Sequence, residues 1–167
     1  MTARQILLFC CAYMVELVAV VYFSRATARR VLGAMVGGSA SAAVAVGAVV
    51  LGEAVGWWRV PSGASPYFWS LLFVGFAISC APIHLVSWRV ARRFGWRGLA
   101  VFWAFAAVVG PPRDYWIAAA FPSWMTFAPG LAPVLADSAT YAGFVALGYA
   151  AMRMVAGPDG ADRLARS

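Results

Sequence analysis

Four carboxylates inside or beside long apolar stretches are the residues of this chain with the clearest capacity for chemistry. They are Glu16, Glu53, Asp114 and Asp137. A charged side chain costs about 2.5–3.5 kcal/mol at the centre of a membrane-spanning helix on insertion scales, so such residues usually face the interior of a bundle and serve a function. We therefore expect these acids to line a polar cavity between helices.

Hydroxyl groups accompany two of the acids at helical spacing. Tyr13 is three residues before Glu16, and Thr140 and Tyr141 are three and four residues after Asp137. Residues three or four positions apart share one face of a helix. Each acid is therefore expected to have a hydroxyl neighbour that can hydrogen-bond to it.

The segment 110–116, of sequence GPPRDYW, most resembles a binding site. Its two prolines remove two backbone donors and disfavour helix before them, so we expect the helix to break at Gly110-Pro111-Pro112. Asp114 would then begin a second half-helix, where a carboxylate suits the free amides and the helix dipole. Broken membrane helices often line ligand sites. The alternative is a simple proline kink with a structural ion pair at Arg113.

These residues make up the predicted site. The ligand-binding set comprises Tyr13, Glu16, Glu53, Arg113, Asp114, Tyr115, Asp137 and Tyr141. If the protein is an enzyme, Glu16 and Asp114 are the candidate catalytic acids.

Metal and cofactor chemistry has little support in the sequence. The single histidine, His84, cannot supply two axial ligands to haem and is expected to be a packing or interfacial residue. The cysteines Cys10, Cys11 and Cys80 lie in apolar runs, where cysteine is commonly a small buried hydrophobe. No phosphate loop, nucleotide fingerprint, hydrolase elbow or zinc motif is found. We therefore expect no metal and no cofactor.

The composition indicates that lipid is the solvent. The chain of 167 residues is 63% hydrophobic and 11% charged, whereas soluble domains are nearer 45–50% apolar and about 25% charged. Because a spanning helix needs about 20 mostly apolar residues, we expect an all-α polytopic membrane protein with five transmembrane helices. The expected spans are 5–23, 31–55, 67–88, 98–121 and 133–155, in a single bundle over 1–156 with a short cytoplasmic tail at 157–167.

The basic residues predict the orientation. All thirteen are arginines, and ten of them fall in three stretches at 25–30, 89–97 and 153–166. Positive charges favour the cytoplasmic side, so these stretches are expected inside and the N-terminus outside. The predicted location is a bacterial cytoplasmic (inner) membrane. Anionic lipid headgroups, rather than nucleic acid, are the expected partners of the net charge of +7.

Small residues recur every fourth position in the second apolar stretch. Gly33, Gly37, Ser41 and Ala45 share one helix face. Small residues at this spacing let membrane helices approach closely. The face is expected to pack inside the bundle or, alternatively, to form a contact in a homo-oligomer or a larger membrane complex.

Three functional hypotheses fit this pattern. The first is binding of a small or lipid-like ligand, for transport or sequestration, in an outward-facing cavity lined by acids. The second is a membrane enzyme that needs no cofactor and performs acid chemistry on an isoprenoid or another lipid-soluble substrate. The third is a non-catalytic subunit of a larger membrane complex. The first is the main expectation.

Overall fold

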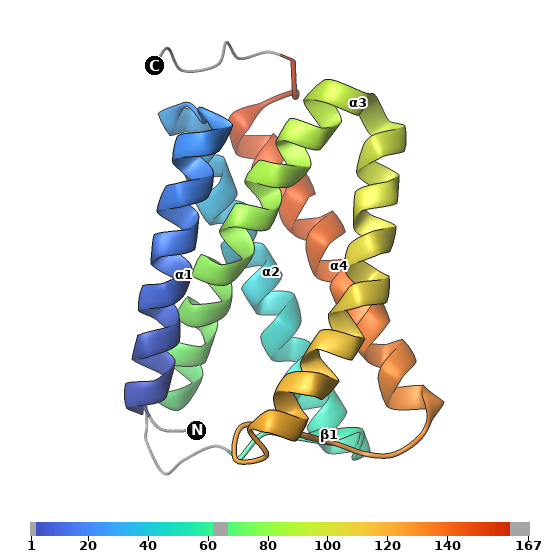
Figure 1. Ribbon diagram of the computed structural model, residues 1–167. Helices are drawn as coiled ribbons and strands as arrows, with labels where there is room; N and C mark the ends of the chain where they lie inside the picture. The colour runs from blue at the N-terminus through green and yellow to red at the C-terminus, as the bar shows by residue number, and fades with distance from the viewer. Residues whose placement is uncertain (1–2, 62–66, 161–167) are drawn as a thin grey trace.

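The computed structural model describes residues 3–61 and 67–160. Over these ranges the protein is a helical bundle with one short pair of strands (Figure 1). The elements are α1 (Ala3–Ser24), α2 (Ala28–Val55), β1 (Trp58–Arg59), α3 (Phe68–Ala120), β2 (Thr126–Phe127) and α4 (Leu131–Ala156). The predicted all-α class is confirmed.

All four described helices are long and apolar enough to cross a membrane. The bounds of α1, α2 and α4 agree with the first, second and fifth predicted spans to within three residues. The outer surface is apolar, and only 11% of the 7–24 segment of α1 is buried. Large apolar side chains such as Val15, Tyr22 and Phe23 are exposed along it. This surface suits lipid rather than water.

Helix α3 contains a reversal at Gly95. This glycine has φ 65° and ψ −162°, the one non-helical conformation within the 53 residues of α3. Such angles are strongly disfavoured for residues with a Cβ, so a glycine is needed there. In Figure 1 the first arm of α3 rises to the turn and the second arm descends beside α4. The third and fourth predicted segments therefore correspond to the two helical arms of α3, which meet at Gly95.

The predicted break at Gly110-Pro111-Pro112 is wrong, because these residues are helical and α3 ends only at Ala120. The reason is tertiary packing. A Cβ built on Gly110 would lie 2.4 Å from the Tyr141 ring, which shows how closely α3 and α4 approach there. Prolines are tolerated in membrane helices where neighbouring helices hold the segment.

The small-residue face of α2 lies inside the bundle. Gly33, Gly37, Ser41 and Ala45 are all buried. A Cβ on Gly37 would lie 2.5 Å from the carbonyl oxygen of Gly148 on α4. The expected packing face is therefore occupied by α4 of the same chain.

The connections are fastened by specific contacts. Thr27 caps the start of α2 by accepting a hydrogen bond from the Arg30 amide at 3.4 Å. Strands β1 and β2 pair antiparallel, with Trp58 opposite Phe127. This pairing joins the connection after α2 to the one after α3, at the end of the bundle where α1 begins (Figure 1).

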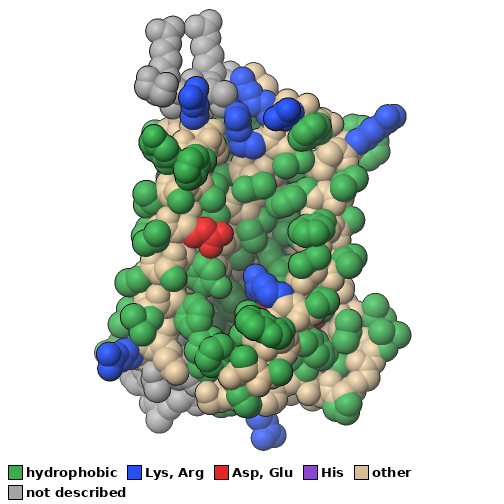
Figure 2. Space-filling view, viewed as in Figure 1, with side chains coloured by type: hydrophobic (Ala, Val, Ile, Leu, Met, Phe, Trp, Pro, Cys, Tyr) green, Lys and Arg blue, Asp and Glu red, His purple; other side chains and the backbone are tan. Residues whose placement is uncertain are grey.

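Charged side chains are distributed unevenly over the bundle. Basic side chains gather at the end that carries the Gly95 turn and the end of α4 (Figure 2). The arginines of the described segments 25–30 and 89–97 account for most of this cluster. Arg163 and Arg166, which belong to the third arginine stretch predicted on the same side, lie outside the described residues.

Candidate functional site

A cavity of about 420 Å³ lies between the helices, in the half of the bundle nearer the strands. Every helix contributes to its walls, and most lining side chains are apolar. Six of the eight predicted site residues line it, namely Tyr13, Glu16, Arg113, Asp114, Asp137 and Tyr141. The volume is within the usual range of small-molecule pockets, and apolar walls with a few polar groups are their usual lining.

The cavity opens on the side of the bundle. Figure 2 shows a hollow in the lateral surface, with one acidic and one basic side chain at its borders. At the strand end, the lining comes from the connections, through Trp58, Val60, Trp124 and Met125.

Three polar side chains form a closed cluster on one wall. Arg113 donates to Asp114 Oδ1 through Nε at 3.0 Å and through Nη2 at 2.8 Å. Arg113 Nη2 also donates to the Tyr141 hydroxyl at 2.6 Å, and this hydroxyl donates to Asp114 Oδ2 at 2.8 Å. Both oxygens of Asp114 act as acceptors. Asp114 is therefore poorly arranged to give a proton to a substrate.

Asp137 lies beside this cluster, on the turn of α4 before Tyr141. Asp137 is 7% exposed, and its Oδ2 has no hydrogen-bond partner within the described part of the chain. The expected partners are engaged elsewhere: the Thr140 hydroxyl donates to Ala136 O at 2.9 Å, and Tyr141 donates to Asp114. A buried carboxylate oxygen without a donor is costly, which marks Asp137 as a group suited to a ligand.

Helix α1 contributes Tyr13 and Glu16 from the opposite wall. Glu16 is exposed and Tyr13 is half-buried. No hydrogen bond joins these two side chains in the described structure, although their spacing led us to expect one. Glu16 is the thirteenth residue after the start of α1, roughly 20 Å along its axis.

Glu53 and Tyr115 do not line this cavity. Glu53 Oε1 accepts a hydrogen bond from the Val60 amide at 2.7 Å, so it ties the chain after β1 to the end of α2. The Tyr115 ring stacks on Phe127 with centroids 4.1 Å apart. These two predicted site residues therefore lie outside the cavity of about 420 Å³ and contact the connections that carry β1 and β2.

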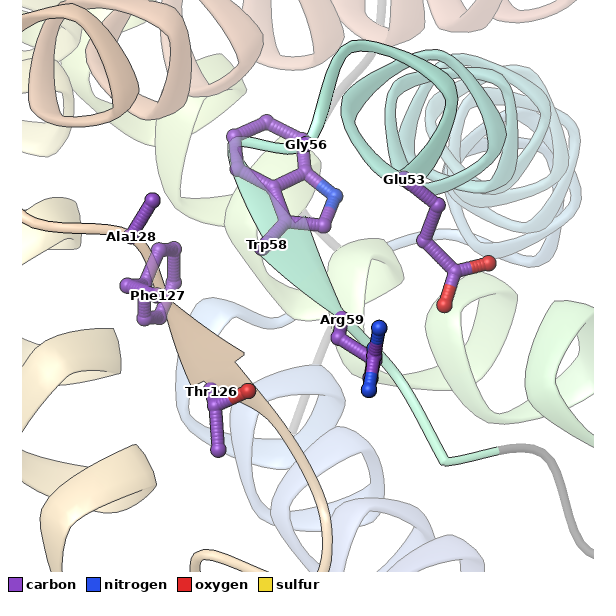
Figure 3. Close-up of a pocket in the computed structure, with 7 residues that line it drawn as sticks. All are labelled: Glu53, Gly56, Trp58, Arg59, Thr126, Phe127 and Ala128. Carbon is purple, nitrogen blue, oxygen red and sulfur yellow. The ribbon is translucent and has the colours of Figure 1, made fainter.

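A second cavity of about 280 Å³ lies at the strand pair. In Figure 3, Glu53 is on one side, Thr126, Phe127 and Ala128 are on the other, and Trp58 and Arg59 lie between them. The Trp58 indole donates to Val49 O at 3.2 Å. Because Trp58 lines both cavities, it forms part of the partition between them.

His84 has a packing role, as the sequence led us to expect. It is fully buried, with Nε2 2.8 Å from Ser41 Oγ. The Ser41 hydroxyl donates to Phe144 O at 2.8 Å, so its oxygen is free to accept from His84 Nε2–H. This chain of contacts links α2, α3 and α4.

Sequence reasoning did not identify several lining residues. Phe76, Ser79 and Phe144 contribute to the cavity wall. They lie in apolar stretches without a distinctive spacing, so no sequence signal separates them from ordinary bundle residues. Only Ser79 is polar, and its hydroxyl donates to Phe76 O at 3.1 Å.

The described residues, 3–61 and 67–160, include no group of three or more His, Cys, Asp or Glu side chains that could hold a metal ion. No protein-family model, no curated protein and no solved structure matches this chain. What the site can do therefore follows from its own geometry: an apolar cavity with one satisfied polar cluster and two further carboxylates, Asp137 and Glu16.

Proposed function

We propose that this protein is a five-span membrane protein that binds a small or lipid-like molecule in the cavity of about 420 Å³. The observation that carries the proposal is the unpartnered Oδ2 of Asp137, inside a cavity with mostly apolar walls. Apolar walls with a few polar groups favour an amphiphilic ligand. Binding would serve transport or sequestration.

The geometry of α3 supports five spans. A straight helix of its 53 residues would be roughly 80 Å long, whereas the hydrocarbon core is about 30 Å thick. The reversal at Gly95 places both arms alongside the other helices (Figure 1). Each arm would then cross the membrane once.

The arginine distribution supports the orientation. The basic end of the bundle would face the cytoplasm, with α1 beginning outside. A bacterial cytoplasmic membrane is the proposed location. The cavity would then lie in the outer half of the membrane, because the strand pair is at the opposite end from the Gly95 turn (Figure 1).

Cysteine labelling tests this topology. In a variant whose three native cysteines are replaced by alanine, Thr126→Cys and Arg97→Cys would each be treated with a membrane-impermeant maleimide on intact spheroplasts. Both positions are exposed. We expect labelling of Thr126→Cys on intact spheroplasts and of Arg97→Cys only after their lysis. Labelling of both from the same side would contradict the spanning of the second α3 arm, and the reverse pattern would contradict the orientation.

Native mass spectrometry of the gently extracted protein tests ligand binding. We expect an additional mass of a few hundred daltons on the intact chain. Ala48→Phe, which would fill the cavity, should abolish this mass, whereas Ala43→Phe on the exposed surface of α2 should retain it. A second protein chain in place of a small molecule would contradict the proposal and favour a subunit of a membrane complex.

Binding is proposed ahead of catalysis because of the hydrogen bonds of Asp114. This carboxylate, one of the two candidate catalytic acids, accepts from Arg113 and from Tyr141. It is better placed to hold the wall together than to start an acid-catalysed reaction.

A further inference from the structure

The buried Asp137 carboxylate points to the chemistry of the ligand. Asp137 is 7% exposed, lines the main cavity and has no donor for Oδ2 within residues 3–61 and 67–160. Leaving a carboxylate oxygen without a hydrogen bond in such a place is unfavourable, and a donor from a ligand removes the cost. The missing partner is therefore a hydrogen-bond donor.

The charges around Asp137 indicate that this donor is cationic. Arg113 and Asp114, on the neighbouring helix, line the same cavity as Asp137. They form an ion pair at 2.8 Å, so together they contribute little net charge. Glu16 is the other acid that lines the cavity. Two carboxylates outside this ion pair, Asp137 and Glu16, therefore line the cavity, and a positively charged group can pair with a carboxylate there.

Aromatic rings in the wall favour the same kind of group. Tyr13, Phe76, Trp124 and Phe144 all line the cavity. The faces of such rings attract organic cations. The remaining walls are apolar and lead to the lateral opening (Figure 2), so an alkyl chain attached to the cation could extend into the bilayer.

We propose that the cavity selects an amphiphile whose head is an ammonium group bearing N–H bonds, which donates to Asp137 Oδ2 while its alkyl chain leaves through the lateral opening. This inference rests on the proposed ligand-binding function and specifies its ligand class. An N–H donor is essential to it, because a quaternary ammonium carries the charge but cannot make the hydrogen bond.

Three probes with the same alkyl chain separate the contribution of the positive charge from that of the hydrogen-bond donor. The purified protein in nanodiscs would be titrated with dodecylamine, dodecyltrimethylammonium and dodecanol, following tryptophan fluorescence because Trp58 and Trp124 line the cavity. We expect dodecylamine to bind about tenfold or more tighter than either of the other two, because it alone combines a hydrogen-bond donor with a positive charge. Dodecanol can donate but is uncharged, and dodecyltrimethylammonium is charged but cannot donate.

Two acid variants form a matched pair. Asp137→Asn should reduce dodecylamine binding to the level of dodecyltrimethylammonium, and it should fold because the removed oxygen has no partner in the described structure. Glu53→Gln removes one negative charge outside the main cavity and keeps an oxygen for the Val60 amide. It should leave dodecylamine binding unchanged. The comparison of probes on the unaltered protein tests the proposal even if a variant is unstable.

The source of the ammonium group is resolved by lipid competition. Displacement of dodecylamine by phosphatidylethanolamine but not by phosphatidylcholine would support a membrane aminolipid as the ligand. Displacement by neither, with dodecylamine still preferred, would support a free amphiphilic amine.

The results also separate this inference from the proposed function. Equal binding of all three probes, or dodecylamine binding unaffected by Asp137→Asn, would overturn the ammonium assignment while leaving a ligand-binding cavity. The absence of any probe binding, together with no bound mass in native spectra, would overturn both.

Discussion

The Tyr141 hydroxyl donates a hydrogen bond to Asp114 Oδ2 at 2.8 Å, although the two residues are 27 positions apart and lie on different helices. Arg113 donates to both partners, so the second arm of α3 is fastened to α4 at one wall of the cavity. The approach is close because Gly110 has no side chain and the Tyr141 ring packs against its backbone. These hydrogen bonds thus join two helices and form part of the polar lining of the cavity.

Removal of the Tyr141 hydroxyl should destabilise the bundle. Tyr141→Phe leaves Asp114 Oδ2 without its donor, and we expect the free energy of unfolding to fall by about 1–3 kcal/mol. Unfolding by SDS in mixed micelles measures this. Tyr22→Phe is the control, because Tyr22 is 77% exposed. Equal midpoints for the two variants would show that the cluster contributes nothing to stability.

The buried Ser41 hydroxyl should contribute more to the stability of the bundle than the exposed Ser39 hydroxyl on the same helix. Ser41→Ala removes the acceptor of His84 Nε2 and the donor to Phe144 O, so a loss of about 1–3 kcal/mol is expected. Ser39→Ala removes only an exposed bond to Met35 O within α2 and should change stability little. Thermal denaturation in detergent compares them. A larger effect at Ser39 would contradict the three-helix role of Ser41.

Two glycines of α2 should respond differently to the same substitution. A Cβ on Gly38 would lie 2.2 Å from Ala77 O, a backbone atom that cannot move without shifting α3. We expect Gly38→Ala to cost about 1–3 kcal/mol through overpacking. Gly47→Ala meets nothing within 4 Å and should be neutral. The fraction of each variant that remains monomeric after heating, measured by size-exclusion chromatography, distinguishes them. Equal fractions for the two variants would contradict the close α2–α3 contact.

The buried Arg30 should hold the chain after α4. It donates to Gly157 O at 2.9 Å and to Pro158 O, and its guanidinium lies over the Trp88 ring. Arg30→Met removes these bonds, so amide hydrogen exchange at Gly157, Asp159 and Gly160 should accelerate. Arg93→Met, which changes an exposed arginine at the Gly95 turn, should leave exchange there unaltered. Unchanged exchange in Arg30→Met would show that other contacts are enough to hold the segment after α4 in place.

Much of the fold could be predicted because it follows from local sequence properties. The length of each apolar run predicts where a helix begins and ends, and the bounds of α1, α2 and α4 lie close to the predicted positions. Gly95 lies within the predicted loop at 89–97, yet the chain there is helical on both sides of it. The prolines at 111 and 112 misled the prediction, because local propensity was outweighed by packing against Tyr141.

The candidate site was predictable in part for the same reason. An ionisable residue in an apolar run is unfavourable wherever it faces lipid, so Glu16, Asp114 and Asp137 were identified from the sequence and line one cavity. Glu53 shows the limit of that reasoning. It has the same pattern in the sequence, but its carboxylate accepts from the Val60 amide instead.

Hydrophobicity and charge act residue by residue, so the sequence alone indicates a lipid environment, a helical class and the residues that require polar surroundings. Which of these residues lie in contact depends on how the helices pack. The Tyr141 hydroxyl could have served Asp137, four positions away on its own helix, but it donates to Asp114 and leaves Asp137 Oδ2 unpartnered. That choice depends on the approach of α3 to α4 at Gly110, a long-range contact that no local spacing encodes.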